Sequence, residues 1–365
     1  MASRIRHIAD LAHVSTATVS LALNNKPGVS HATRERVLTI AETLKRNSAA
    51  QSFNTLIKGS VRFLKIVKHS RIVNRDHDVF IAAYIEGMDK EARKHGYNLE
   101  ITHITFDQIG EFVSHLNSSS SKGLIVLGTE LNARDIQGFE DVNVPIVVID
   151  TTFDFIKLDF VDMNNTEALF QIVRHFVENN HRDIGLIWGE EVEARNFELR
   201  RLAFEQALKY FNLPFNPRNI ITVDSTFAEA CQGVLRYLKS GPKLPTALVS
   251  ANDLIASACL KVFKESGIRV PQDVSIIGFD NLPMCEMLDP PLTTMRVSKQ
   301  QIGETAMELL IGRINHRIGA PTLKVSVGGQ LVIRKSVRCL PQPEERQPEP
   351  AEAIDQNGAL ALRRM

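Results

Sequence analysis

The first 44 residues carry apolar side chains at helical spacing, in three short runs separated by helix breakers. Ile8 and Ala12 fall on one face of a first helix. Ser15 can cap a second helix over residues 16–23, because its hydroxyl can accept a backbone N–H at the helix start. A turn-forming Asn-Asn-Lys-Pro-Gly run follows, and Ser30 can cap a third helix. Two such helices joined by a tight turn are typical of a helix-turn-helix.

The pattern changes after residue 60 to short apolar strands that alternate with amphipathic helices. Short connections between such elements indicate a doubly wound parallel sheet. The alternation restarts near residue 166, which predicts two α/β lobes that face each other across a cleft. Strands are expected at residues 61–67, 99–104, 123–127, 145–149, 184–188, 220–223, 247–250 and 274–278. Helices are expected at residues 79–95, 109–117, 133–139, 166–179, 195–211, 227–238 and 254–266.

The charge is distributed unevenly between the two parts. Residues 1–60 hold eight Lys and Arg but three Asp and Glu, a net charge of +5, whereas the whole chain carries +1. A basic head on a slightly acidic body is the electrostatic pattern of a nucleic-acid-binding protein. A solvated three-helix bundle without a partner is the alternative.

These patterns predict a fold class and its boundaries. The fold is an all-α helix-turn-helix DNA-binding head followed by an α/β body of two lobes with a ligand cleft between them. The head is expected at residues 1–46, a linker or hinge at 47–60, the body at 61–340 and a Pro/Glu/Gln-rich disordered tail at 341–365. Lobe 1 is expected to contain about residues 61–160 and 282–340, and lobe 2 about residues 161–281.

Composition excludes several classes of protein. With 365 residues and 44% hydrophobic content, the chain can build large cores. Its apolar runs are too short for a membrane span, and charged residues interrupt the N-terminus, which argues against a signal peptide. Four scattered cysteines have no metal-type spacing, and no nucleophile elbow, phosphate loop or zinc motif occurs. We therefore expect no enzyme activity, cofactor or metal, and a cytoplasmic, nucleoid-associated location.

Several motifs resemble those of one known family. The head contains IADLAHVSTATVS from residue 8, followed by Leu-Asn at 23–24, Val-Ser at 29–30 and TRERV from residue 33. The body contains Asn-Asp at 252–253, IGFD from 277, PPLTT from 290 and LVIRKS from 331. In order and spacing this pattern resembles the lactose/galactose repressor (LacI/GalR) family over about residues 3–340. The resemblance implies that the α/β body is a two-lobed effector domain of the periplasmic-binding-protein type. His13 and Leu21 depart from the usual residues, so the preferred operator should differ from the commonest one of the family.

The resemblance implies roles for residues of the head. Base edges in the DNA major groove would be contacted by Thr16, Ala17 and Leu21. Phosphates would be contacted by Ser15, Thr18, Ser20 and Asn24. The segment from Asn47 would form the family's hinge helix, with Phe53 as the apolar wedge in the minor groove. A flexible linker with Phe53 packed on the body is the alternative.

Five residues are candidates for an effector site between the lobes. Three polar side chains follow or cap the predicted strand ends, namely Asp150, Asn252 and Asp280. Arg200 matches the family's pocket arginine, and Phe80 could supply an apolar wall. Each isolated Asp or Asn could instead be a simple cap.

Nearby residues suggest the character of the effector. Lys68 and His69 would add positive charge beside Arg200, which adds a sugar acid or sugar phosphate to a sugar as candidate effectors. Residues 74–78, NRDHD, would lie at the cleft mouth as a solvated loop, with a ligand or metal site as the less favoured reading.

The predicted function is therefore transcription regulation. The chain should be a homodimeric repressor that binds palindromic double-stranded operator DNA, with an affinity set by a sugar or sugar-derived effector. The alternative is a small-molecule-binding protein of periplasmic type without a DNA function.

Overall fold

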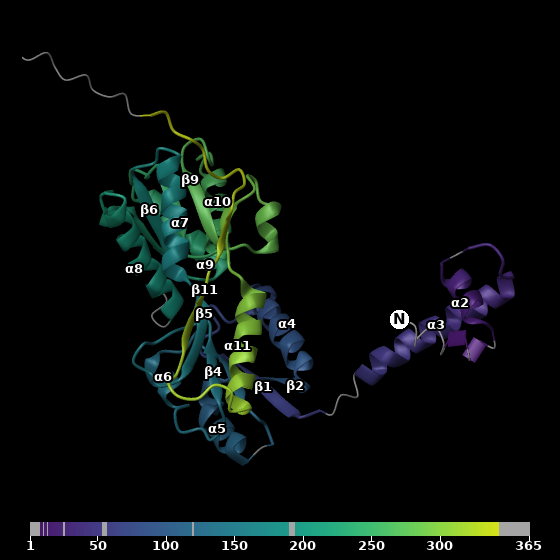
Figure 1. Ribbon diagram of the computed structural model, residues 1–365. Coiled ribbons are helices and arrows are strands. Elements are labelled where there is room, and N and C mark those ends of the chain that lie inside the picture. Colours follow the sequence, from purple (N-terminus) through teal and green to yellow (C-terminus); the bar gives the residue numbers. More distant parts are fainter. Residues whose placement is uncertain are drawn as a thin grey trace, which may run out of the picture.

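The computed structural model describes residues 8–9, 11–12, 14–24, 26–52, 57–118, 120–189 and 194–342. The head contains helical residues at 8–12, helix α2 (Thr16–Leu23) and helix α3 (His31–Ser52) (Figure 1). Ser15 caps α2 as predicted, because its Oγ accepts the Thr18 backbone N–H at 3.1 Å. The small core of the head is made by Ile8, Ala9, Ala12, Val19, Ala22 and Val37.

Helix α3 differs from the expected division between head and hinge. Its backbone continues through residue 46 and ends at Ser52, so no separate hinge helix begins at Asn47. Residues 45–52 contain neither Gly nor Pro, and nothing in their sequence forces the helix to stop. Phe53 lies outside the described residues, as does the tail from residue 343 onward.

Lobe 1 is built on a six-stranded parallel sheet with the order β11-β5-β4-β3-β1-β2. Its strands are β1 (Gly59–Val67), β2 (Tyr97–Thr105), β3 (Leu124–Leu127), β4 (Ile146–Ile149), β5 (Asp159–Met163) and β11 (Lys324–Val327). Its helices are α4 (Asp78–Lys94), α5 (Ile109–Ser118), α6 (Ala133–Gln137) and α11 (Lys299–Ile314). Successive residues of β1 point to opposite faces of the sheet, and both faces are covered. Phe63 therefore packs into one apolar cluster and its neighbour Leu64 into another.

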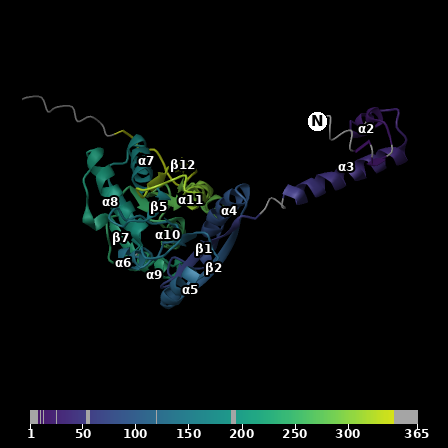
Figure 2. The ribbon, with the colours of Figure 1, turned by 60° about the horizontal axis from the view of Figure 1, so that its bottom comes forward.

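Lobe 2 repeats this architecture with the order β12-β10-β9-β8-β6-β7. Its strands are β6 (Ile184–Gly189), β7 (Ile220–Val223), β8 (Ala247–Ser250), β9 (Ser275–Asp280), β10 (Thr293–Arg296) and β12 (Gln330–Val332). Its helices are α7 (Asn165–Glu178), α8 (Arg195–Tyr210), α9 (Phe227–Lys239) and α10 (Asp253–Glu265). Only β12 pairs antiparallel, with β10. Figure 1 shows the two sheets, each with its flanking helices, as two lobes one above the other, and Figure 2 shows the same body turned by 60°.

The predicted boundary between the lobes was partly wrong. Residues 282–340 do not all return to lobe 1, since β10 and β12 join the sheet of lobe 2 while α11 and β11 complete lobe 1. The chain therefore crosses between the lobes three times, after β5, after β10 and after β11. Strand β5 was also missed, because Asp159 and Asp162 interrupt its apolar run although all five residues are buried.

Two glycines allow helices α4 and α11 to touch backbone to backbone. A Cβ at Gly87 would collide with the Gln300 carbonyl, and one at Gly303 would collide with the Tyr84 carbonyl. This close approach fixes α11 on lobe 1 immediately after the chain leaves lobe 2. Within the described ranges, no helix is long and apolar enough to cross a membrane.

Candidate functional site

A cavity lies between the lobes, at the carboxyl ends of the strands. All five candidate effector residues line it, so the structure brings together side chains from five separate segments. The lining consists of Ile72, Val73, His77, Phe80, Ile81, Thr129, Asp150, Ala194, Asn196, Phe197, Arg200, Asn252 and Asp280. A cavity that combines apolar walls with convergent polar groups is the usual form of a small-molecule site.

Asp150 and Asp280 reach the cavity through an unusual backbone conformation. Asp150 directly follows β4 and has φ 61°, and Asp280 ends β9 with φ 112°. Positive φ is uncommon for residues other than glycine, and it turns the chain sharply at each strand end. Both carboxylates thereby lie at the cavity although the strands themselves are buried.

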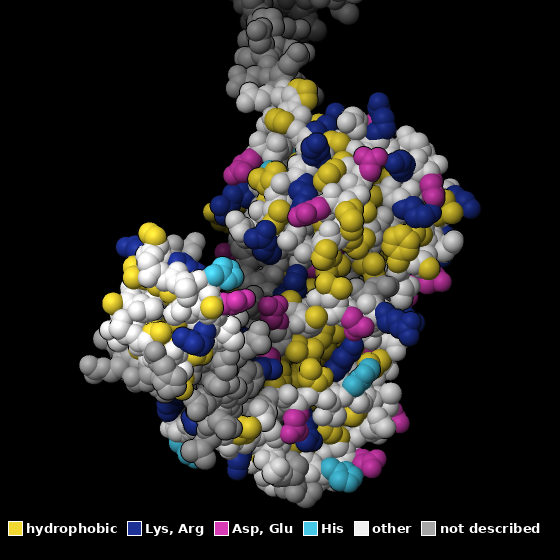
Figure 3. Space-filling view, turned by 90° about the vertical axis from the view of Figure 1, so that its right-hand side faces the viewer, with side chains coloured by type: hydrophobic (Ala, Val, Ile, Leu, Met, Phe, Trp, Pro, Cys, Tyr) yellow, Lys and Arg dark blue, Asp and Glu magenta, His cyan; other side chains and the backbone are white. Residues whose placement is uncertain are grey.

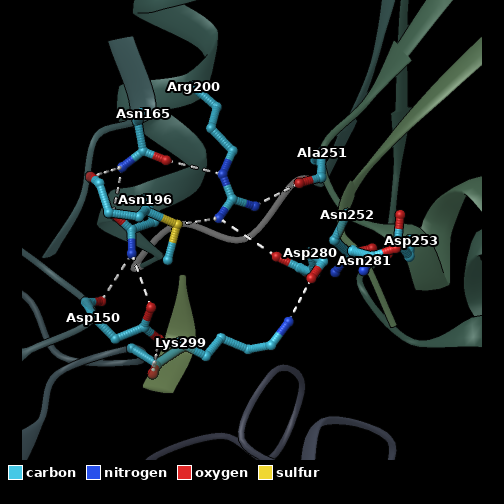
Figure 4. A network of polar contacts seen from close by, with 12 residues as sticks. Asp150, Asn165, Asn196, Arg200, Ala251, Asn252, Asp253, Asp280, Asn281 and Lys299 are labelled. Atoms are coloured by element: carbon cyan, nitrogen blue, oxygen red, sulfur yellow. Dashed lines mark hydrogen bonds and ion pairs between the residues drawn. The ribbon is translucent and has the colours of Figure 1, made fainter. Parts of the chain in front are cut away.

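The Asp150 carboxylate is held by lobe 1 and lobe 2 together. Tyr84 donates its hydroxyl to Asp150 Oδ1 at 2.9 Å, and Thr129 donates to Oδ2. From lobe 2, Asn196 Nδ2 donates to the Asp150 carbonyl at 3.0 Å, to its Oδ1 at 3.2 Å and to Asp162 Oδ1 at 3.2 Å (Figure 4). Asp150 is therefore the centre of a polar network that joins the lobes.

Arg200 is buried, and protein groups already occupy much of its guanidinium. Its Nε donates to Asn165 Oδ1 at 3.0 Å and its NH1 group to the Ala251 carbonyl at 2.5 Å (Figure 4). The guanidinium carbon lies 3.8 Å from the centre of the Phe279 ring, a cation–π contact. These contacts orient Arg200 but leave it without an open bidentate fork for an anion.

Asp280 is the less satisfied of the two carboxylates. Its Oδ1 lies 3.9 Å from Arg200 NH2, beyond hydrogen-bond distance. Among the residues that the structure describes, no side chain or backbone N–H donates a close hydrogen bond to its carboxylate. Lys299 Nζ instead donates to the Asp280 backbone carbonyl and lies 4.9 Å from the centre of the Phe80 ring. Asp280 can therefore accept hydrogen bonds from a ligand.

Burial dominates the proton affinities around the cavity. It raises the pKa of Asp280 despite the opposing charges of Arg200 and Lys299. It also raises the pKa of Asp150, against the hydrogen bonds from Thr129 and Tyr84. Burial and the neighbouring Asp150 charge raise the pKa of Asp162 to about 7. The site thus contains buried carboxyl groups whose charged form is disfavoured by the loss of contact with solvent.

Asn252, His77 and Phe80 complete the cavity. Asn252 does act as a cap, because its Oδ1 accepts the Ile255 N–H at 2.8 Å at the start of α10. It also lines the cavity, and its Nδ2 lies 3.4 Å from His77 Nε2 across the cleft. His77 ends the short 3₁₀ helix Arg75–His77 and is buried, so the expectation of a solvated loop over residues 74–78 was wrong for this residue.

The expected positive charge from Lys68 and His69 does not line the cavity. Lys68 Nζ pairs with Asp135 Oδ2 at 2.6 Å, and His69 Nδ1 lies 3.2 Å from Glu130 Oε1. Both side chains are thus engaged by acidic residues of lobe 1. The sequence could not show this, since these partners lie more than 60 residues away along the chain.

Sequence reasoning missed several lining residues. Asn196 and Phe197 start helix α8 after strand β6, a position at which a ligand contact could have been sought. Thr129 follows β3 in the same way. No cluster of three potential metal ligands was found in the part of the chain that the structure describes.

The candidate DNA-binding residues at helix α2 differ in exposure. Ser15, Thr16, Ala17, Ser20 and Asn24 are exposed, whereas Thr18 and Leu21 are half-buried. The side of the helix that faces the core of the head is buried through Val19 and Ala22. This arrangement leaves small polar side chains free to approach a nucleic acid. Asn47 belongs to α3.

A helix-turn-helix head joined to a two-lobed body with an interlobe cavity defines a ligand-responsive DNA-binding regulator. Residues 4–45 match the model of bacterial regulatory proteins of the lacI family, and residues 173–337 match the periplasmic binding protein-like domain. The chain belongs to the lacI family, and it is a transcriptional regulator rather than an enzyme.

Individual relatives extend over nearly the whole chain. The HTH-type transcriptional repressor PurR of Aliivibrio salmonicida (strain LFI1238) is 31% identical over 92% of this chain and 99% of its own length. The HTH-type transcriptional repressor CytR of Escherichia coli (strain K12) is 32% identical over 93% of this chain and 98% of its own. The lac repressor dimer bound to operator and the anti-inducer ONPF superposes with a TM-score of 0.66 at 23% identity, covering 91% of this chain and 98% of the other. These relatives favour a regulator over a periplasmic-type binding protein without a DNA function.

Proposed function

We propose that this chain is a homodimeric repressor whose operator affinity is set by a neutral, polyhydroxylated effector bound between the lobes. The observation that carries this proposal is the Asp280 carboxylate, which lines the cavity and has an ion partner no closer than 3.9 Å. Hydroxyl groups of a sugar or sugar-like ligand would donate to it, while Phe80 and Phe197 would pack against its apolar faces.

The charge of the cavity argues against a sugar acid or sugar phosphate. Asp150 and Asp280 both line it, whereas Arg200 is the cation among its lining residues and is already bonded to protein groups. An anionic ligand would be placed between two buried carboxylates, which is unfavourable in a low-dielectric site. The earlier expectation of an anionic effector rested on Lys68 and His69, which pair elsewhere.

A ligand panel tests the effector class directly. Trp188 is the single tryptophan of the chain, and its ring centre lies 6.3 Å from that of Phe197 on the cavity wall. Titration with ribose, glucose, cellobiose, gluconate and glucose 6-phosphate should change Trp188 fluorescence for neutral ligands only. Binding confined to the two anions would refute the proposed class.

The head should read one half of a palindromic operator. We assign base contacts to Thr16, Ala17 and Leu21, and phosphate contacts to Ser15, Thr18, Ser20 and Asn24. Asn47 and the Phe53 wedge would contact the minor groove. A gel-shift series that compares the full chain with a chain lacking residues 1–60 should show binding for the full chain alone, and Phe53→Ala should weaken specific binding without changing effector affinity.

A second copy of this chain is the partner required by a palindromic operator. Figure 3 shows apolar side chains gathered over both lobes on one face of the body. Val79 of α4 and Ile101 of β2 are more than half exposed, on elements that lie on that side of lobe 1 in Figure 1. Light scattering should give a dimer for the parent and a monomer for Val79→Asp/Ile101→Asp. A cytoplasmic location on the nucleoid follows from this role.

A further inference from the structure

The segment between β1 and α4 contacts both lobes and the cavity. We call residues 68–77 the strap. Ile72 and Val73 are buried and line the cavity. Arg71 NH1 lies 3.4 Å from Asp224 Oδ2 of lobe 2, and His77 Nε2 lies 3.4 Å from Asn252 Nδ2 of lobe 2. The strap therefore belongs to lobe 1, forms part of the cavity wall and meets lobe 2 at two points.

One buried carboxylate, that of Glu130, accepts hydrogen bonds from the backbone of the strap. Glu130, which follows β3, is 1% exposed. Its Oε1 accepts the N–H groups of Ile72 and Val73, both at 2.8 Å. Its Oε2 accepts those of Lys68 at 2.9 Å and His69 at 3.2 Å. Four backbone donors from one six-residue stretch thus converge on a single side chain.

The Glu130 carboxylate is suited to this role in its ionised form. Burial tends to raise its pKa, but the four backbone N–H groups outweigh burial, and the pKa lies below its usual value. Ser70, in the middle of the stretch, has φ 60°, a left-handed conformation that closes the loop around the carboxylate. Removing the charge would leave several buried N–H groups without an acceptor.

We propose that Glu130 is a positioning residue for effector binding, which acts through the strap and does not touch the ligand. Through Ile72 and Val73 it sets the shape of the cavity wall, and through Arg71 it sets the contact with lobe 2. This proposal rests on the effector role of the cavity proposed above. It adds that affinity depends on a residue absent from the cavity lining.

The lobe 2 side of the contact is also preorganised. Asp224 Oδ1 accepts the Thr226 N–H at 2.8 Å and the Thr226 hydroxyl at 2.9 Å, which leaves Oδ2 directed to Arg71. Because this acceptor is already fixed, the contact with Arg71 is favourable only when the strap holds Arg71 in the matching position. Glu130 and Asp224 thus hold the two ends of one interlobe contact.

The test compares Glu130→Gln with a matched control in the full chain. The control is Glu91→Gln, because Glu91 is a buried lobe 1 glutamate that pairs with Lys94 and His95 and not with the strap. Hydrogen exchange at the amides of residues 68, 69, 72 and 73 should accelerate at least tenfold in Glu130→Gln and stay at the parental rate in Glu91→Gln. Trypsin should cleave after Arg71 or Arg75 faster in Glu130→Gln alone.

Affinity then separates positioning from simple stability. For each panel sugar that binds the parent, Glu130→Gln should weaken binding at least tenfold, and Glu91→Gln less than twofold. Arg71→Ala should weaken binding about threefold in the parent and add nothing in Glu130→Gln, because both act through the strap.

Parental exchange rates in Glu130→Gln would overturn the proposal. Accelerated exchange with parental affinity would equally overturn the role in binding. If no panel sugar bound the parent, the proposed effector class would fail, while exchange and trypsin cleavage would still decide whether Glu130 holds the strap.

Discussion

The two lobes of the body follow the same strand order but use it differently. Read from the outer edge of each sheet, β2-β1-β3-β4-β5-β11 corresponds to β7-β6-β8-β9-β10-β12. Asp150 and Asp280 therefore occupy equivalent places, each at the end of the fourth strand of its lobe and each with positive φ. Equivalent topology delivers a carboxylate to the cavity from both sides.

The surroundings of the two carboxylates differ. Asp150 accepts hydrogen bonds from Tyr84, Thr129 and Asn196, whereas Asp280 faces Arg200 at 3.9 Å. One carboxylate is consumed by the protein and the other is available to a ligand. Whether a buried carboxylate can bind a ligand therefore depends on how many of its hydrogen-bonding positions the protein leaves open, and not on its place in the fold alone.

Substitution of Asp150 should have the largest effect, and this effect should fall on the stability of the fold. Asp150→Ala should lower the free energy of unfolding by about 3 kcal/mol, because three buried donors lose their acceptor. Urea unfolding followed by Trp188 fluorescence measures this change. The neighbouring exposed Asp154→Ala serves as the control and should stay within about 0.5 kcal/mol of the parent. An equal loss in both variants would contradict a structural role for Asp150.

The second effect should fall on binding. Asp280→Asn should weaken binding of a neutral sugar about 30-fold, or roughly 2 kcal/mol, because a charged acceptor for ligand hydroxyls becomes a neutral one. Its unfolding free energy should remain at or above the parental value, since an incompletely paired buried charge is removed. Trp188 titration and urea unfolding measure the two quantities. Parental affinity in this variant would exclude Asp280 as the ligand acceptor.

The third effect concerns pH. The pKa of Asp162 is about 7, above its usual value of 3.8, so the unfolded chain loses this proton at lower pH than the folded chain does. Stability from this residue should therefore decline as pH rises from about 4 towards 7, by on the order of 2 kcal/mol between pH 5 and pH 8. Asp162→Asn should flatten that decline in urea unfolding across the range. An unchanged pH profile would show that Asp162 does not remain protonated.

Much of the fold could be read from local pattern. Thr16–Leu23 is a helix with the expected Ser15 cap, and the β3, β4 and β8 strands appear as fully buried apolar runs. The five effector candidates also converge on one cavity. The convergence of Asp150, Asn252 and Asp280 has a simple cause, because the carboxyl ends of parallel strands meet at one edge of each sheet. The effector role of these residues stays a prediction.

The failures involve interactions between distant parts of the chain. Strand β5 was not predicted, because a charged Asp159 is unfavourable in a buried strand. In the structure Arg313 of α11 pairs with Asp159 at 2.7 Å, which makes its burial possible. The strands β10 and β12 belong to lobe 2 because they pair at the edge of its sheet beyond β9. The local sequence pattern predicts that they are strands but not which sheet they join. The charge of Lys68 is likewise neutralised by a residue far along the chain.

The three crossings between the lobes have a consequence for synthesis. The first sheet lacks its edge strand β11 until residues 324–327 have been made, and Asp159 lacks its partner Arg313 until α11 has been made. The face of β3, β4 and β5 that α11 covers is open until α11 has been made. A nascent chain leaving the ribosome in order must therefore carry an unfinished lobe 1 while lobe 2 emerges from β6 to β10, and chaperone demand should be highest in that interval.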